Sequence, residues 1–200
     1  ISICVFLSGF SCFAQLYYFQ PLLPDLAKDF ILSASESSFA ISFSTLGMVF
    51  GLFTTMFVAD RIPRKKMIGT GLLSSSIFSV AASSFSPTFL PLILLSAAKG
   101  FLLSGATSVS MAYIAEEVSS RNKGKIMGLY IAGNALGGMA GRVISSWIGA
   151  LYTWRIASVS IGLICALFAI LFLLFSPRST NFMPRKESFH TLIIANLQLI

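Results

Sequence analysis

The sequence predicts an all-α transmembrane protein whose chain crosses a bilayer six times. Apolar residues make up 56% of the 200 residues, only 10% are charged, and the mean hydropathy is +0.85. Soluble domains carry roughly 25% charged residues and need polar groups to cover their outside. A surface that faces lipid removes that need. Six apolar runs of about 20 residues are each long enough to cross about 30 Å of hydrocarbon, so we expect a bundle of six spanning helices.

Prolines, a serine cap and a basic hinge bound the first three expected helices. We place these helices at about residues 3–23, 34–59 and 67–85. Pro21 and Pro24 are expected to stop the first helix, because proline lacks a backbone N–H donor. Ser33 or Ser35 is expected to cap the second helix, with Glu36 in its first turn, where a negative charge is favourable.

The other three expected helices lie at about residues 91–114, 126–151 and 156–175. Together the six helices make one transmembrane bundle over residues 1–176. A polar tail over residues 177–200 follows. Its final stretch, TLIIANLQLI, is too short to span a bilayer, and a helix lying on the membrane surface is one possible structure for it.

Basic residues are concentrated in alternate connections between the apolar runs. Ten of the 14 lie after the second, fourth and sixth helices: Arg61, Arg64, Lys65, Lys66, Arg121, Lys123, Lys125, Arg178, Arg185 and Lys186. The positive-inside rule therefore puts these segments, and both present ends of the chain, in the cytoplasm. The net charge of +7 is explained by this topology. We expect no nucleic acid partner, because the basic residues form no patch interleaved with aromatic side chains.

The sequence contains no recognisable motif for catalysis or metal binding. Cys4, Cys12 and Cys165 lie in apolar runs without a CxxC pair, so we interpret them as small buried hydrophobic residues. His190 lies in the polar tail and is expected to be solvated. The sequence contains no HExxH and no GxSxG, and we expect no enzyme activity, no metal and no cofactor.

The hinge after the second helix, MFVADRIPRKK, combines a carboxylate with a dense basic cluster. It resembles the first cytoplasmic loop of the major facilitator superfamily, which typically reads GxxxDRxGRRR, although Met56 and Pro63 replace its glycines. The resemblance implies a conformational latch of seven residues: Asp60, Arg61, Arg64, Lys65, Glu116, Glu117 and Arg121. An ordinary positive-inside loop would explain the basic residues but not their order.

The fifth expected helix carries the run GLYIAGNALGGMAGR. It is similar to the GxxxGPxxGG motif of the antiporters of that superfamily, with Gly138 in place of the proline and Arg142 in place of the last glycine. Glycines four residues apart form a flat face on a helix, against which a neighbouring helix packs closely. The expected packing motif consists of Gly133, Gly137, Gly138 and Gly141.

The resemblance covers nearly the whole chain and implies both a fold and a function. The fold would be the N-terminal half of a twelve-helix major facilitator protein, made of two inverted three-helix repeats, with the second six-helix half as a missing partner. The function would be alternating-access transport of a small organic solute, as proton-coupled efflux across a bacterial inner membrane. An alternative is a truncated, non-transporting membrane fragment or scaffold. By itself this half is not expected to transport.

Three polar residues within the helices are candidates for the substrate cavity: Lys99, Asn134 and Arg142. A cation in hydrocarbon costs about 2.5–3.5 kcal/mol on insertion scales, so Lys99 and Arg142 should face a wet cavity or a partner, or else extend to the membrane surface. The superfamily usually has an arginine in an RxxxG pattern on the fourth helix, but here Ser96 takes its place and Lys99 lies beside Gly100.

No Asp or Glu lies at mid-depth in any of the six expected helices. A proton-coupled transporter usually has a titrating carboxylate within the membrane. We therefore expect the coupling group in the second half or at Glu36. Two cations without an acid within the membrane also favour an organic anion as substrate.

Overall fold

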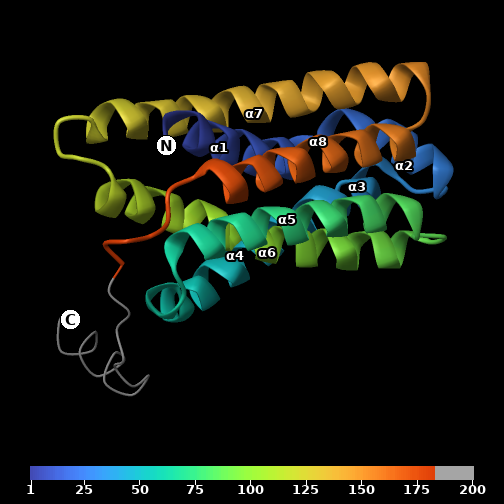
Figure 1. Cartoon of the computed structure of the whole chain (residues 1–200). Coiled ribbons are helices and arrows are strands. Elements are labelled where there is room, and N and C mark those ends of the chain that lie inside the picture. Colours follow the sequence, from blue (N-terminus) through green and yellow to red (C-terminus); the bar gives the residue numbers. More distant parts are fainter. Residues whose placement is uncertain (183–200) are drawn as a thin grey trace.

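Helices form nearly all of the part that the computed structural model describes, residues 1–182 (Figure 1). The α-helices are α1 (Ser2–Tyr17), α2 (Leu23–Asp29), α3 (Ala34–Ser37), α4 (Phe39–Val58), α5 (Arg64–Ser84), α6 (Phe89–Glu117), α7 (Lys123–Leu151) and α8 (Trp154–Phe175). Two 3₁₀ turns, η1 (Gln20–Leu22) and η2 (Ala59–Arg61), extend α1 and α4. The described residues contain no strand, which confirms the all-α prediction.

Five segments within residues 1–182 are long and apolar enough to cross a membrane: Ser2–Asp29, Ala34–Arg61, Arg64–Ser84, Phe89–Glu117 and Trp154–Phe175. The sixth expected crossing is α7, which is less apolar because glycines and three basic residues dilute its sequence. With 29 residues it is as long as α6, and it runs beside the other long helices along the bundle (Figure 1). The six expected helices are therefore all present as helices.

The prolines do not end the first crossing where the sequence suggested. α1 ends at Tyr17, but Pro21 and Pro24 are the second residues of η1 and α2, and the helical path continues to Asp29. The N–H that proline lacks is not needed at the start of a helix. Pro91 is accommodated in the same way in the first turn of α6, which begins two residues earlier than expected.

Side-chain caps fix the start of two helices. The Ser33 hydroxyl accepts a hydrogen bond from the Glu36 N–H at 3.2 Å, and the Glu36 carboxylate accepts one from the Ser33 N–H at 2.8 Å. This reciprocal pair is a capping box, and it selects Ser33 rather than Ser35 as the cap. Thr153 caps α8 in the short turn after α7.

Glycines bring two pairs of helices into backbone contact. A Cβ atom added to Gly133, Gly137 or Gly141 of α7 would meet the backbone of α1. The second pair, α4 with α6, is closed in the same way by three glycines that the sequence analysis did not single out: Gly47, Gly51 and Gly100. Close approach of this kind is how helices associate where no hydrophobic effect drives them together.

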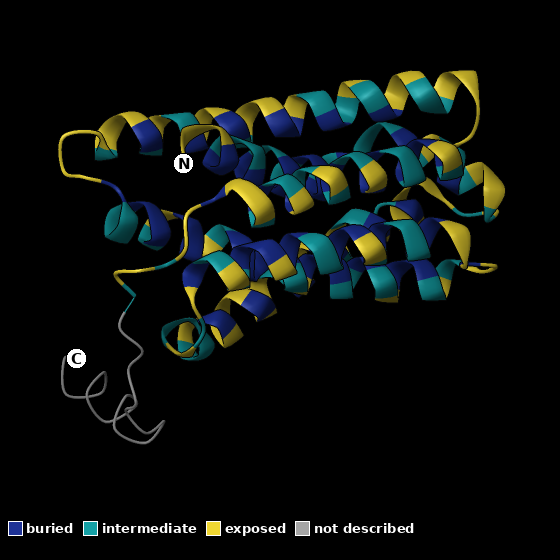
Figure 2. Cartoon of the chain, in the orientation of Figure 1, coloured by how far each residue is buried: buried dark blue, intermediate teal, exposed yellow. Residues whose placement is uncertain are grey.

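The outward faces of the bundle are apolar. Figure 2 shows buried residues on the inner sides of the helices and exposed residues along the outer faces of α4 and α7. Phe50 and Phe53 on α4 and Val143 and Trp147 on α7 are all more than half exposed. An apolar outside around a packed inside is the pattern of a bundle covered by lipid or by further membrane helices.

Candidate transport sites

The charged connections gather at one end of the bundle, here called the basic end, formed by residues 59–66, 118–125 and 176–182 (Figure 1). Arg64 is at its centre and is only 8% exposed. Its Nη2 lies 2.9 Å from Asp60 Oδ1 and 3.2 Å from Glu116 Oε1, and its Nη1 donates to the Ala59 carbonyl at 2.7 Å. One arginine therefore joins η2, the start of α5 and the end of α6.

Glu117, which follows Glu116 at the end of α6, binds the tail instead of the hinge. Glu117 accepts hydrogen bonds from the Thr180 hydroxyl and the Asn181 N–H, both at 2.9 Å. The Asn181 amide also donates to the Glu116 carbonyl at 3.0 Å. The two neighbouring glutamates thus connect to different segments: one to the α4–α5 hinge and one to the chain that leaves α8.

Lys65 strengthens the same attachment of the tail. Its Nζ donates to the Ser176 carbonyl at 2.6 Å, and its backbone N–H donates to the Ser179 hydroxyl at 2.9 Å. Arg61 and Arg121, the other two residues of the expected latch, are exposed and form no ion pair within the described residues. Five of the seven expected latch residues therefore make direct contacts at the basic end.

Lys99 lies on α6 with its amine inside the bundle. The residue is 1% exposed, and Nζ lies 4.5 Å from the centroid of the Tyr18 ring and 4.9 Å from that of Phe19. No oxygen of the described residues accepts a hydrogen bond from it. The amine does not extend to a membrane surface. Its contact with a substrate stays a prediction, since helices of this half enclose it.

Asn134 and Arg142 lie two turns apart on α7 and both face α1. Arg142 Nε donates to Gln20 Oε1, and the guanidinium lies 4.5 Å from the centroid of the Tyr17 ring. Asn134 is half-buried beside Gly9, and its Oδ1 accepts no hydrogen bond. These side chains put polar groups along the seam between α1 and α7.

A second charged cluster lies at the opposite end of the bundle. Asp29 Oδ2 accepts a hydrogen bond from Trp154 Nε1 at 2.9 Å and pairs with Arg155 at 3.4 Å. Arg155 also donates to the carbonyls of Ser83 and Ser86, at 2.9 and 3.2 Å. The cluster ties the end of α2 to the α5–α6 turn and to the start of α8. Sequence reasoning missed it, because its members lie far apart in the chain and form no motif.

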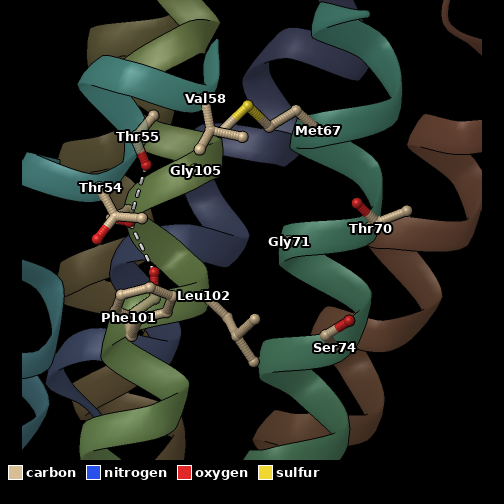
Figure 3. Close-up of a pocket in the computed structure, with 11 residues that line it drawn as sticks. Thr54, Thr55, Val58, Met67, Thr70, Gly71, Ser74, Phe101, Leu102 and Gly105 are labelled. Atoms are coloured by element: carbon tan, nitrogen blue, oxygen red, sulfur yellow. Dashed lines mark hydrogen bonds between the residues drawn. The ribbon is translucent and has the colours of Figure 1, made fainter. Parts of the chain in front are cut away.

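A cavity of about 200 Å³ lies between α4, α5 and α6 (Figure 3). Its polar lining is made of hydroxyl groups, and Thr55 and Ser104 form a hydrogen bond of 3.3 Å across it. Thr54 and Thr70 donate to carbonyls of their own helices. No charged residue and none of the candidate cavity residues lines this space, so it is a groove between helices rather than an expected substrate site.

Long apolar helices around an enclosed cation, with a charged cluster at each end, define a multi-pass membrane protein. The chain belongs to the Major Facilitator Superfamily, whose family model matches residues 2–196. This finding confirms the family that the hinge and glycine motifs predicted.

Similar proteins are named as transporters. An uncharacterised transporter of Buchnera aphidicola is 38% identical over 190 residues, which make up 95% of this chain and 46% of that protein. The inner membrane transport protein YnfM of Escherichia coli is 36% identical over 194 residues, covering 97% of this chain and 46% of YnfM. The chain therefore spans about half the length of the curated relatives it matches.

Solved structures match the fold over the same half. The proton:xylose symporter XylE superposes with a TM-score of 0.78 at 18% sequence identity, covering 89% of this chain and 44% of XylE. A bacterial homologue of the human lysosomal transporter Spinster gives 0.72 at 16% identity and covers 95% of this chain. The fold is the N-terminal half of a major facilitator protein, as the sequence predicted.

Proposed function

We propose that this chain forms one half of a secondary transporter that exports a small organic solute in exchange for protons by alternating access. The observation that carries the proposal is the Arg64 cluster at the basic end. It joins three segments through contacts that can be broken and remade, on a half in which two helix pairs are packed backbone to backbone. Proton coupling is supported by one neighbour of the same fold, XylE, which is a proton symporter.

The proposed latch closes the basic end in one state of the cycle. Charge-assisted hydrogen bonds contribute about 1.5–3 kcal/mol each where they are shielded from water. Arg64 is well shielded, but Asp60 and Glu116 are partly exposed, so the cluster is strong enough to favour one state and weak enough to open. In this role Glu117, Thr180 and Asn181 attach the departing tail to the same cluster.

We propose an organic anion as the substrate class. Arg142 and Asn134 bring a cation and an amide to the α1–α7 seam. No carboxylate of the described residues lies among them to favour a cation. In this proposal Arg142 and Asn134 contact the substrate directly.

We also propose that the basic end faces the cytoplasm of a bacterial inner membrane, so that both ends of this chain lie on the same side. The ten basic residues of the connections and the tail support this orientation. A cysteine introduced at exposed Ser120 should react with an impermeant maleimide only in inverted vesicles. Reaction in intact spheroplasts would reverse the assignment.

Transport should be tested with the intact protein that contains this chain, reconstituted in liposomes with a pH-sensitive dye inside. Benzenesulfonate, tetraphenylphosphonium and xylose serve as anionic, cationic and neutral probes. We expect benzenesulfonate, which stays charged and does not carry protons through lipid by itself, to move protons across the membrane, whereas the other two should not. Absence of exchange and of proton movement with all three probes would contradict the transport proposal, and a response to tetraphenylphosphonium alone would contradict the substrate class.

A further inference from the structure

Lys99 is held differently from the buried and half-buried arginines of the described part. Arg64, Arg142 and Arg155 are buried or half-buried, and each donates hydrogen bonds to oxygen atoms. The Lys99 ammonium is more deeply buried than any of them, at 1% exposure, and donates to none. A buried charge normally requires a partner, so this lysine needs a separate explanation.

Aromatic faces take the place of an acceptor. Tyr18 and Phe19 are themselves fully buried, and their ring centroids lie 4.5 and 4.9 Å from Nζ. Ring faces attract a cation but do not bind it through a directed hydrogen bond. They therefore stabilise the ammonium without fixing it in the charged form, and they also pack against a neutral amine.

Other polar groups of the bundle interior are also without partners. The Ser11 hydroxyl and both amide atoms of Gln15 on α1, and the Ser96 hydroxyl one turn before Lys99 on α6, are buried and form no hydrogen bond within the described residues. Hydroxyl and amide groups can accept from an ammonium or donate to an amine. The bundle interior thus contains groups suited to both protonation states of a buried lysine.

No charged residue stands opposite Lys99 on the helices that pack against it. Among the described residues, the titratable groups that face it are the phenol of Tyr18, which directly follows α1, and the Cys165 thiol on α8. The Cys165 thiol donates to the Ser11 carbonyl at 3.7 Å. A neighbouring carboxylate would hold the lysine permanently charged, and none is present there.

We propose that Lys99 is the site at which the transporter binds and releases its coupling proton. In the release step, an N–H bond of the ammonium breaks, the electron pair stays on Nζ as the neutral amine forms, and the proton passes to water that enters when the half opens. Uptake is the reverse. This role rests on the proposed proton coupling and replaces the intramembrane carboxylate that the sequence lacks. Lysine suits it because its amine can lose a proton, whereas arginine cannot.

The protonation of Lys99 can be tested without a substrate. The intact transporter is labelled with a nitrogen isotope at lysine Nζ, and NMR spectra are recorded between about pH 5 and pH 9. Comparison with Lys99→Arg assigns the resonance, and Lys99→Gln does so if that variant does not fold. We expect the Lys99 signal to change from ammonium to amine within this range. A Lys99 signal with one charge state throughout would overturn the proposal.

A transport assay separates this inference from the function on which it rests. With benzenesulfonate in liposomes, Lys99→Gln and Lys99→Arg should both abolish uptake driven by a pH gradient. Exchange of labelled for unlabelled benzenesulfonate, which needs no net proton transfer, should stay within about twofold of the wild type. Loss of exchange in both variants would instead assign Lys99 to substrate binding and overturn the proposal. If the wild type is not proton-coupled, the proposed function fails. If the wild type is coupled and both variants stay coupled, the role of Lys99 is wrong.

Discussion

The same substitution at two glycines of α7 should have opposite effects on stability. A Cβ atom added to Gly137 would lie 2.5 Å from the Phe10 Cα and 2.7 Å from its carbonyl carbon, so α1 and α7 must move apart. A Cβ atom added to Gly128, nine residues earlier in the same helix, has nothing within 4 Å. The pair therefore separates the cost of the backbone contact from the intrinsic effect of replacing glycine in a helix.

The magnitudes follow from this geometry. Overpacking at a closed contact costs about 1–3 kcal/mol, and the backbone on the α1 side cannot rotate away as a side chain would. Alanine in place of an unhindered helical glycine gains about 0.5–1 kcal/mol. We expect Gly137→Ala to be destabilised relative to the wild type and Gly128→Ala to be equal to it or slightly more stable.

Thermal unfolding of the intact transporter in detergent, followed by circular dichroism, measures both variants. Gly137→Ala should unfold at a lower temperature than Gly128→Ala, by several degrees. If Gly137→Ala unfolds at the same temperature as Gly128→Ala or at a higher one, α1 and α7 are not in the backbone contact described here. The explanation of the glycine motif would then be wrong.

Two further predictions concern the ends of the bundle. Glu116→Gln removes the carboxylate that pairs with Arg64. It should lower the unfolding temperature and speed the opening of the basic end, as followed by cysteine labelling. Glu117→Gln can still accept hydrogen bonds from the tail and should change both quantities much less; equal effects of the two variants would contradict the division of roles. Trp154→Phe removes the hydrogen bond to Asp29 and should lower the free energy of unfolding by about 1 kcal/mol. An unchanged unfolding temperature would show that this bond does not stabilise the opposite end of the bundle.

The sequence predicted the helices and the family but not which way each polar side chain points. The apolar runs and the order of charges in the hinge are local features, and local features survive in a single sequence. The direction of Lys99 depends on the rotation of α6 against α1, and a change of one residue in register turns a side chain by about 100°. The enclosure of its amine by Tyr18 and Phe19 was therefore not predictable.

Contacts between distant segments were missed for a related reason. Thr180 and Asn181 bind Glu117 across more than 60 residues of sequence, with no periodicity or motif to connect them. Gly47 and Gly51 have the four-residue spacing of a packing face, and they could have been found. They were overlooked because only the run on α7 resembles a known motif.

The glycine contacts follow the inverted repeat of the fold. If the first three crossings correspond to the last three, the pair of the first and fifth, α1 with α7, corresponds to the pair of the fourth and second, α6 with α4. Both pairs are closed by glycine against backbone. The third and sixth, α5 with α8, correspond to each other, and their glycines meet side chains first: Gly69 meets Leu173 and Gly162 meets Val80. Backbone contacts cannot yield as side chains do, so among these three pairs the contact between α5 and α8 is the one that can adjust most easily.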